Sequence, residues 1–273
     1  MHTHTNLLDH QRLPHAVMDP TPNVLVCLLG NFRLLRCGEP LDLPIAGKAM
    51  TLLSQLGLHL NSGVPREGLL EVLWPEQDAA HSMVSLNSLV YSVQRRLRDG
   101  TRDAAAVIYS NGCYSLNSAA GVSTDVALFD TLADRGNRLA AADQESAATL
   151  YYRHAVELYR GDLCTGDDVY AVIERERLRA SFLTILAWLA DRANQAGDDA
   201  AALGYALQLL ACDPCREDAH RVVMRAHVRR GERAQALRQY RLCEQALRRE
   251  FEAPPEVQTT ELFDRIRLDP TSI

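Results

Sequence analysis

Two kinds of hydrophobic pattern follow one another in the front part of the chain. Residues 24–29 form an apolar run of β-prone side chains, and Gly30 separates it from the segment 32–36, Phe-Arg-Leu-Leu-Arg. A turn at Gly38-Glu39-Pro40 then leads to the alternating Leu41-Asp42-Leu43. Short β-prone runs separated by turn residues are typical of antiparallel strands, so the pattern predicts a small antiparallel sheet at the start of the fold.

From Lys48 onward the apolar positions recur every three or four residues, which indicates helices. A first helix starts near Lys48, and a second begins at Pro65, where proline suits a first turn, and runs to Trp74. Asp78 is placed to cap a third helix that continues to about Arg98. The apolar positions of this third helix form the stripe Leu86, Val90, Val93 and Leu97.

A hairpin signal follows these helices. Asn111-Gly112 separates two β-prone runs, 107–110 and 113–116, and that arrangement favours a tight β-turn. The order of sheet, three helices and hairpin is that of a winged helix, whose third helix enters a DNA major groove. At about 100° per residue, the face opposite the apolar stripe holds Val84, Ser88, Tyr91 and Arg95, flanked by Asn87, Ser92 and Arg98.

The rear part of the chain repeats with a period of 34 residues. Gly197 aligns with Gly231, and Ala202 aligns with Ala236. Glycine at the turn and small residues at fixed offsets are typical of stacked helical hairpins of tetratricopeptide type, which usually bind partners. A helix from about Pro255 to Leu268 is expected to cap the array. The sequence therefore predicts a mainly α protein, an N-terminal winged helix-turn-helix followed by a tetratricopeptide-like all-α array.

An arginine series follows one helix of this array. Arg221, Arg225 and Arg229 lie at i, i+4 spacing and would form one basic face. Most basic helix faces contact only water, but this one is also suited to an acidic partner or to DNA that flanks the site bound by the winged helix. These three arginines are therefore candidate partner-binding residues.

Charge and composition leave DNA open as a partner. The net charge of −6 belongs mainly to the rear part, because residues 23–117 hold eight basic and eight acidic side chains. Local clustering, rather than the total, decides whether a protein can meet a phosphate backbone. The seven cysteines are scattered, and the Cys212–Cys215 pair lies at a break between helices without a second pair at zinc spacing. We expect reduced thiols, a cytoplasmic protein and no metal site.

The sequence carries no signal of a membrane protein or of an enzyme. Residues 1–22 are rich in histidine and proline without a signal-peptide pattern, and we expect a disordered tail. No apolar run approaches the roughly 18 residues of a membrane span. Gly47-Lys48 lacks the upstream glycine of a phosphate-binding loop, because residue 42 is Asp, and no hydrolase or zinc-protease motif occurs. We therefore expect no catalysis and no cofactor.

Several motifs resemble a known combination of domains. The front part is similar to OmpR-type winged helices at Leu28-Leu29-Gly30, at Gly47-Lys48 before Leu52-Leu53, at 64–74, in the helix 85–97 and in the wing 112–116. The motifs of the rear part, which are more specific, are Asp125 with Phe129, 158–163, 175–178, Asp213-Pro214 with Arg216-Glu217, and 224–240. Together they resemble the antibiotic-regulatory-protein type of transcriptional activator. The resemblance implies an OmpR-type domain at 23–118 and a bacterial transcriptional activator domain at 124–268.

That resemblance implies a sequence-specific activator that binds double-stranded promoter DNA, often as a homodimer, and recruits RNA polymerase or another protein partner. On this hypothesis Ser88, Tyr91 and Arg95 approach base edges, with Asn87 and Ser92 beside them. The DNA phosphates are contacted by Arg96, Arg98 and Lys48, and Asn111 lies at the wing tip.

Other interpretations of the same residues stay open. Tyr91 would also suit packing under the wing, Arg95 an ion pair with Glu71 or Asp99, and Lys48 a plain helix start. Family members commonly carry arginines along the third helix where this chain has Asn87, Ser92 and Gln94. The alternative function is accordingly a protein-interaction scaffold whose winged helix no longer binds DNA.

Overall fold

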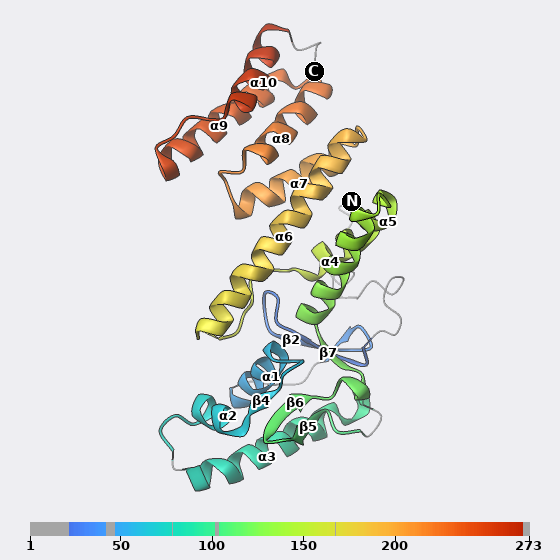
Figure 1. The fold of residues 1–273 in the computed structure, drawn as a ribbon, viewed down its shortest axis with the longest axis vertical. Coiled ribbons are helices and arrows are strands. Elements are labelled where there is room, and N and C mark those ends of the chain that lie inside the picture. Colours follow the sequence, from blue (N-terminus) through green and yellow to red (C-terminus); the bar gives the residue numbers. More distant parts are fainter. Residues whose placement is uncertain (1–21, 42–46, 78, 102–103, 167, 270–273) are drawn as a thin grey trace, which may run out of the picture. The chain divides into compact units, whose positions relative to one another are not determined.

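The fold is taken from a computed structural model that describes residues 22–41, 47–77, 79–101, 104–166 and 168–269. Within these ranges the chain divides into two compact units, one ending at Leu178 and the other beginning at Arg179. Figure 1 shows the elements of both units, and each unit is described by itself. The predicted tail 1–22 lies almost entirely outside the described residues, as do the Asp78 cap and Asp42-Leu43.

The first unit begins with a four-stranded sheet in the order β3-β2-β1-β7. Its strands are β1 (Val24–Cys27), β2 (Arg33–Arg36), β3 (Glu39–Pro40) and β7 (Val122–Thr124). The predicted turn at 38–40 is shifted, because Glu39 and Pro40 pair with β2. The turn itself is Cys37-Gly38, and both residues have positive φ (50° and 85°). That geometry is the type I′ turn which suits the twist of a two-residue hairpin.

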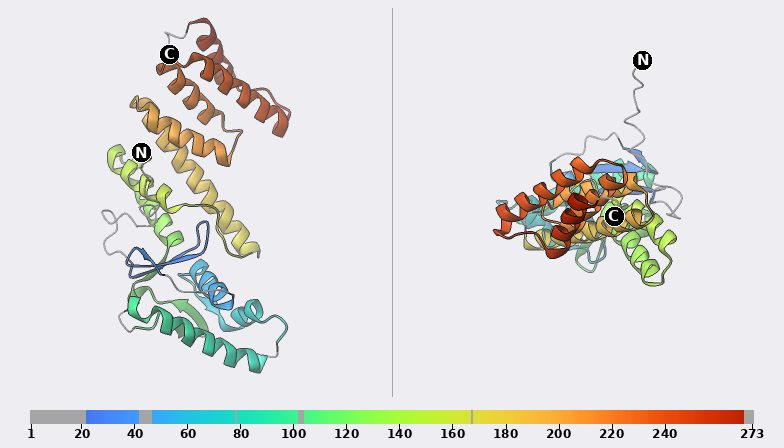
Figure 2. Two further views of the ribbon diagram at one scale, coloured as in Figure 1. Left: turned by 180° about the vertical axis from the view of Figure 1, so that it is seen from behind. Right: turned by 90° about the horizontal axis from the view of Figure 1, so that it is seen from above.

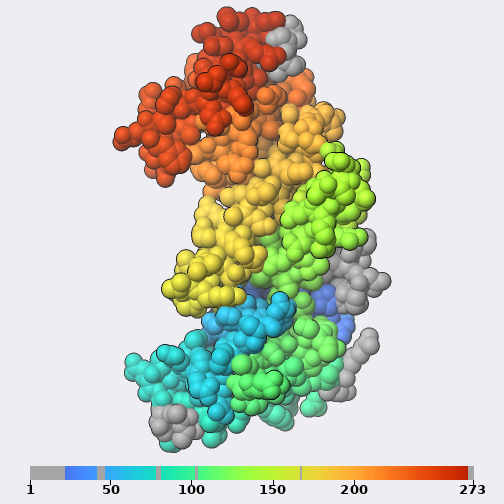
Figure 3. Space-filling view, in the orientation of Figure 1, coloured from blue at the N-terminus to red at the C-terminus, as the bar shows by residue number. Residues whose placement is uncertain are grey.

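Three helices and a second sheet complete the winged helix. The helices are α1 (Lys48–Leu58), α2 (Arg66–Leu73) and α3 (Ala79–Leu97), and a 3₁₀ turn at Arg98–Gly100 follows α3. The wing is the hairpin of β5 (Val107–Ser110) and β6 (Cys113–Leu116), joined by β4 (Val64–Pro65). Pro65 pairs with Cys113 and precedes α2 instead of opening it. In the space-filling view the wing residues lie at the surface beside α1 (Figure 3).

A helical hairpin packs in the same unit as the sheet. It consists of α4 (Asp125–Ala141) and α5 (Glu145–Leu158), which lie side by side (Figures 1 and 2). The two helices approach closely at Gly136, which faces the ring of Tyr152. Thr124 caps α4, since its hydroxyl oxygen accepts a hydrogen bond from the Ala127 N–H at 3.1 Å.

The second unit is a stack of helices. It contains the later part of α6 (Val169–Gln195), then α7 (Asp199–Cys212), α8 (Glu217–Arg229), α9 (Arg233–Phe251) and α10 (Val257–Leu268). Gly197 and Gly231 occupy equivalent turns with φ of 73° and 76°. Ala202 and Ala236 are both fully buried. These positions confirm the 34-residue period.

The last helix closes the array, as the sequence predicts. Leu262 and Ile266 of α10 pack with Met224 of α8 and Ala236 of α9 in one buried cluster. The rings of Tyr240 and Phe263 stack at the edge of this cluster with centroids 4.1 Å apart. No helix in the described ranges is both long and apolar enough to cross a bilayer.

Candidate nucleic-acid interface

The helix α3 has one buried and one exposed face, as its periodicity predicts. Leu86, Val93 and Leu97 are almost completely buried. The opposite positions Val84, Ser88, Tyr91 and Arg95 are all exposed. Tyr91 is 64% exposed, so it does not pack under the wing.

Charge is concentrated at the carboxyl end of this helix. Arg95, Arg96 and Arg98 are exposed, and cations in a last helical turn also interact favourably with the helix dipole. Among the described residues, Arg95 has neither of the suggested ion pairs. Asp99, one of those suggested partners, instead lies 3.5 Å from Arg36. The Arg95 guanidinium is thus available to a ligand.

Two hydrogen bonds fix the wing against α3. The Tyr114 hydroxyl donates to Oδ1 of Asn87 at 3.2 Å, and the Gln94 side-chain amide donates to the Val107 carbonyl at 2.7 Å. Burial, followed by the neighbouring Tyr109, raises the pKa of Tyr114, which favours the protonated hydroxyl that donates this hydrogen bond. Asn87 therefore orients the wing, and in a bidentate contact with adenine its Oδ1 would have to accept from Tyr114 and from the base together.

The wing tip is also held in place. Asn111 and Gly112 form the turn with φ of 50° and 81°, and the Gly112 carbonyl accepts a hydrogen bond from the Arg66 N–H at 3.1 Å. The backbone that carries the exposed Asn111 is therefore held in place. Sequence reasoning missed Tyr109, which is 49% exposed and whose ring lies 4.6 Å from that of Tyr114. Its cross-strand pairing with Tyr114 through the Asn-Gly turn was the available signal.

The remaining candidates have mixed environments. Lys48 opens α1, as one interpretation expects, and its ammonium lies over the Trp74 ring, 4.4 Å from the ring centroid. This cation–π contact leaves the ammonium accessible, because Lys48 is itself exposed. Ser92 is half-buried at the border of the two faces of α3. The structure thus brings Ser88, Tyr91 and Arg95 together on one face and places Ser92 at its edge.

A buried carboxylate joins the sheet to α4. Asp125 is 1% exposed, and its two carboxylate oxygens accept the N–H groups of Leu28 at 2.7 Å and Leu29 at 3.0 Å. Burial raises the pKa of Asp125 to about 6, although the two N–H donors act in the opposite direction. Phe129, one helical turn later, is fully buried. Asp125 therefore attaches α4 to the first strand region, and the Phe129 ring packs 5.6 Å from that of Tyr159.

The segment before α6 reinforces this attachment. The Leu28 carbonyl accepts from the Cys164 N–H at 2.9 Å, and the Gly30 N–H donates to the Asp162 carbonyl at 3.0 Å. Arg175 of α6 donates to the carbonyls of Leu163 at 3.1 Å and Gly166 at 2.9 Å. The motifs at 158–163 and 175–178 thus build one hydrogen-bonded junction with the sheet.

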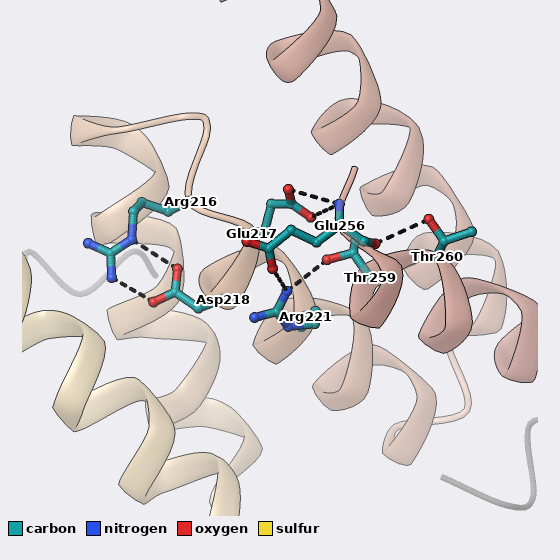
Figure 4. Close-up of polar contacts among 7 residues, drawn as sticks. All are labelled: Arg216, Glu217, Asp218, Arg221, Glu256, Thr259 and Thr260. Atoms are coloured by element: carbon teal, nitrogen blue, oxygen red, sulfur yellow. Dashed lines mark hydrogen bonds and ion pairs between the residues drawn. The ribbon is translucent and has the colours of Figure 1, made fainter. Parts of the chain in front are cut away.

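Two arginines of the expected basic face of the array have partners within the fold, and partner binding by this face stays a prediction. Arg221 donates from Nη1 to Glu256 at 3.2 Å and to the Thr259 hydroxyl at 2.8 Å, as Figure 4 shows. Arg229 donates to Asp199 at 2.7 Å and to the Asn194 side chain at 2.9 Å. The helical face that carries these arginines lies against α10 at one end and against the α6–α7 turn at the other. Arg221 and Arg229 therefore connect neighbouring helices of the array.

Comparison with known proteins gives the family. Residues 124–267 match the model of the bacterial transcriptional activator domain. The regulatory protein DnrI of Streptomyces peucetius is 28% identical over 237 residues, which cover 83% of this chain and 86% of DnrI. The regulatory protein AfsR of Streptomyces coelicolor is 26% identical over 240 residues, which cover 88% of this chain and 24% of AfsR.

A solved structure supports the fold independently. Mycobacterium tuberculosis EmbR superposes with a TM-score of 0.67 at 20% identity, over 90% of this chain and 65% of the EmbR chain. The chain therefore spans less than two thirds of that EmbR chain and about a quarter of AfsR. The match over 124–267, the two regulatory relatives and the winged helix with its helical array lead to one conclusion: the chain belongs to the bacterial transcriptional activator domain family and is a transcriptional regulator of the antibiotic-regulatory-protein type.

Proposed function

We propose that this chain binds double-stranded promoter DNA through α3 and the wing, and that it activates transcription by contacting RNA polymerase or another protein through its helical array. It would act in the cytoplasm, as a homodimer on repeated half-sites. The proposal includes the domain limits 23–118 and 124–268. It rests on the family relationship and on the exposed polar face of α3 beside a fixed wing.

Each candidate residue has a role in this proposal. Ser88, Tyr91 and Arg95 read base edges, because they lie on the exposed face of α3. Arg96, Arg98 and Lys48 contact phosphates, which position the protein without reading sequence. Asn111 enters the neighbouring minor groove from the wing tip. Asn87 and Ser92 border the reading face, and Asn87 keeps the wing in register with it.

Binding to DNA tests the proposal directly. The full chain should select defined sites from a random duplex pool, and its affinity should fall linearly with log salt, since each neutralised phosphate releases counterions. Measurement by mobility shift at several salt concentrations gives both the affinity and the slope. A chain that selects no sites and shows no salt-dependent duplex binding would support the scaffold alternative.

Arg95→Ala should weaken binding to the selected site by about tenfold to a hundredfold, the cost of one good base contact of about 1–3 kcal/mol. Binding to unrelated duplex should fall much less. Arg138→Ala is a matched control, because Arg138 is an exposed arginine of α4 and its loss changes the net charge equally. Equal losses on specific and unrelated DNA would remove Arg95 from the base-reading face.

A further inference from the structure

The second unit contains a pocket of about 320 Å³ between four of its helices. Small side chains of α6 and α8 leave the space open, among them Ala187, Ala190 and Ala219. Leu209 of α7 and Gln258 of α10 close it from two other sides. The volume is at the lower end of the range for small-molecule sites in proteins.

Most charged groups that line this pocket are already paired. Asp218 accepts two hydrogen bonds from Arg216, at 2.9 and 2.6 Å (Figure 4). Asp191 accepts from Arg192 at 3.0 Å and from Gln195 at 2.8 Å. Both acids are therefore satisfied by partners outside the pocket.

Arg225 is different. Its side chain lines the pocket and is half-buried, and within the described ranges no hydrogen bond or ion pair reaches its guanidinium. Burial, followed by Arg221, Arg229 and Arg265, lowers the pKa of Arg225, whereas Asp191 raises it. A half-buried cation among other cations is stabilised by a bound anion, because an anion supplies both charge and hydrogen-bond acceptors.

We propose that this pocket binds a small-molecule oxyanion, a carboxylate or phosphate group carried by a low-molecular-weight ligand. Arg225 is its main hydrogen-bond donor, and the planar guanidinium suits two acceptor oxygens at once. Arg221 and Gln258 also line the pocket, and Arg221 uses only Nη1 in its contacts with Glu256 and Thr259. The compact volume favours a small molecule over an extended peptide.

This inference goes beyond DNA binding. All the residues that line the pocket belong to the helical array, so occupancy is measurable without DNA. A ligand there would contact α6, α7, α8 and α10 together. It would therefore stabilise the array by mass action if it binds only the folded protein.

Calorimetric titration of the full chain tests the site, with inorganic phosphate, pyrophosphate and succinate as probes in chloride of matched ionic strength. We expect saturable binding of at least one probe, with a raised thermal midpoint. The phosphate and succinate arms distinguish the two headgroups. Arg225→Met should raise the dissociation constant about tenfold or more, which corresponds to the loss of one hydrogen bond to a charged group.

Two further variants separate ligand binding from folding. Ala187→Leu fills the pocket without removing a charge and should abolish binding as well, whereas Arg241→Met removes an exposed arginine of α9 and should leave the dissociation constant unchanged. Circular dichroism verifies that each variant is folded. The proposal is overturned if no probe binds the native chain, or if Arg225→Met binds the probes as tightly as the native chain does.

Discussion

Asp125→Ala is expected to lower the free energy of unfolding by about 2–4 kcal/mol. The substitution removes both acceptors from the Leu28 and Leu29 N–H groups, and both residues are fully buried. Water cannot easily replace the lost carboxylate, because Asp125 itself is 1% exposed. The cost is that of leaving two buried donors unpaired, less the cost of burying the carboxylate.

Denaturant unfolding of the full chain measures this loss. Asp134→Ala is the control, because Asp134 is an exposed carboxylate on the same helix and its removal should change stability by no more than about 0.5 kcal/mol. The hydrogen bonds to Leu28 and Leu29 would carry no stability if the two variants unfolded at the same denaturant concentration.

The pH dependence offers a second readout of the same group. Burial raises the pKa of Asp125 to about 6, above its value in the unfolded chain. The folded protein therefore binds this proton more tightly, so the contribution to stability is fully present below about pH 4 and is lost as the pH rises through 6. Relative to Asp125→Asn, the native chain should gain about 1–3 kcal/mol between pH 7 and pH 4. The raised pKa would be contradicted if the difference in unfolding free energy between the native chain and Asp125→Asn did not change with pH.

Gly136→Val is expected to cost about 2–3 kcal/mol. A Cβ at Gly136 would lie 2.5 Å from two ring carbons of Tyr152, closer than packed carbons approach. The ring cannot easily move, because it is buried and its hydroxyl donates to Asn137 at 2.7 Å. Glycine is therefore needed here for the close approach of α4 and α5, despite its low helix propensity.

Gly204→Val is the matched control, since Gly204 lies within α7 and a Cβ there meets nothing within 4 Å. That variant should be neutral or slightly stabilising, because valine has the higher helix propensity. Thermal unfolding compares the two. If the ring causes the cost, the losses from Gly136→Val and Tyr152→Ala should not add, and strict additivity would refute the steric explanation.

Asp125 and the segment before α6 give a physical meaning to motifs that resemblance alone marks. Asp125 belongs to the segment that matches the activator domain, yet the groups it binds are in the winged-helix region. The same is true of the 158–166 segment, which bonds to Leu28 and Gly30. The compact units divide within α6, at Leu178, because these contacts hold the first helical hairpin to the sheet.

The sequence by itself determined the elements whose signals are local. The stripe of α3, the Asn111-Gly112 turn and the repeated glycines of the array were all predictable, because periodicity and turn chemistry depend on near neighbours. Exposure of Ser88, Tyr91 and Arg95 followed from the same periodicity.

Only the tertiary structure decided which distant groups meet. The parallel pairing of β7 with β1, the addition of β4 to the wing and the bond from Tyr114 to Asn87 join residues far apart in the chain. The arginines of α8 illustrate the reason. Their spacing is the same whether the face is solvated or packed, and the positions of Glu256 and Asp199 decide that Arg221 and Arg229 are paired while Arg225 faces a pocket. A hydrophobic pattern specifies a face, but the partner of a face is set by the elements that fold against it.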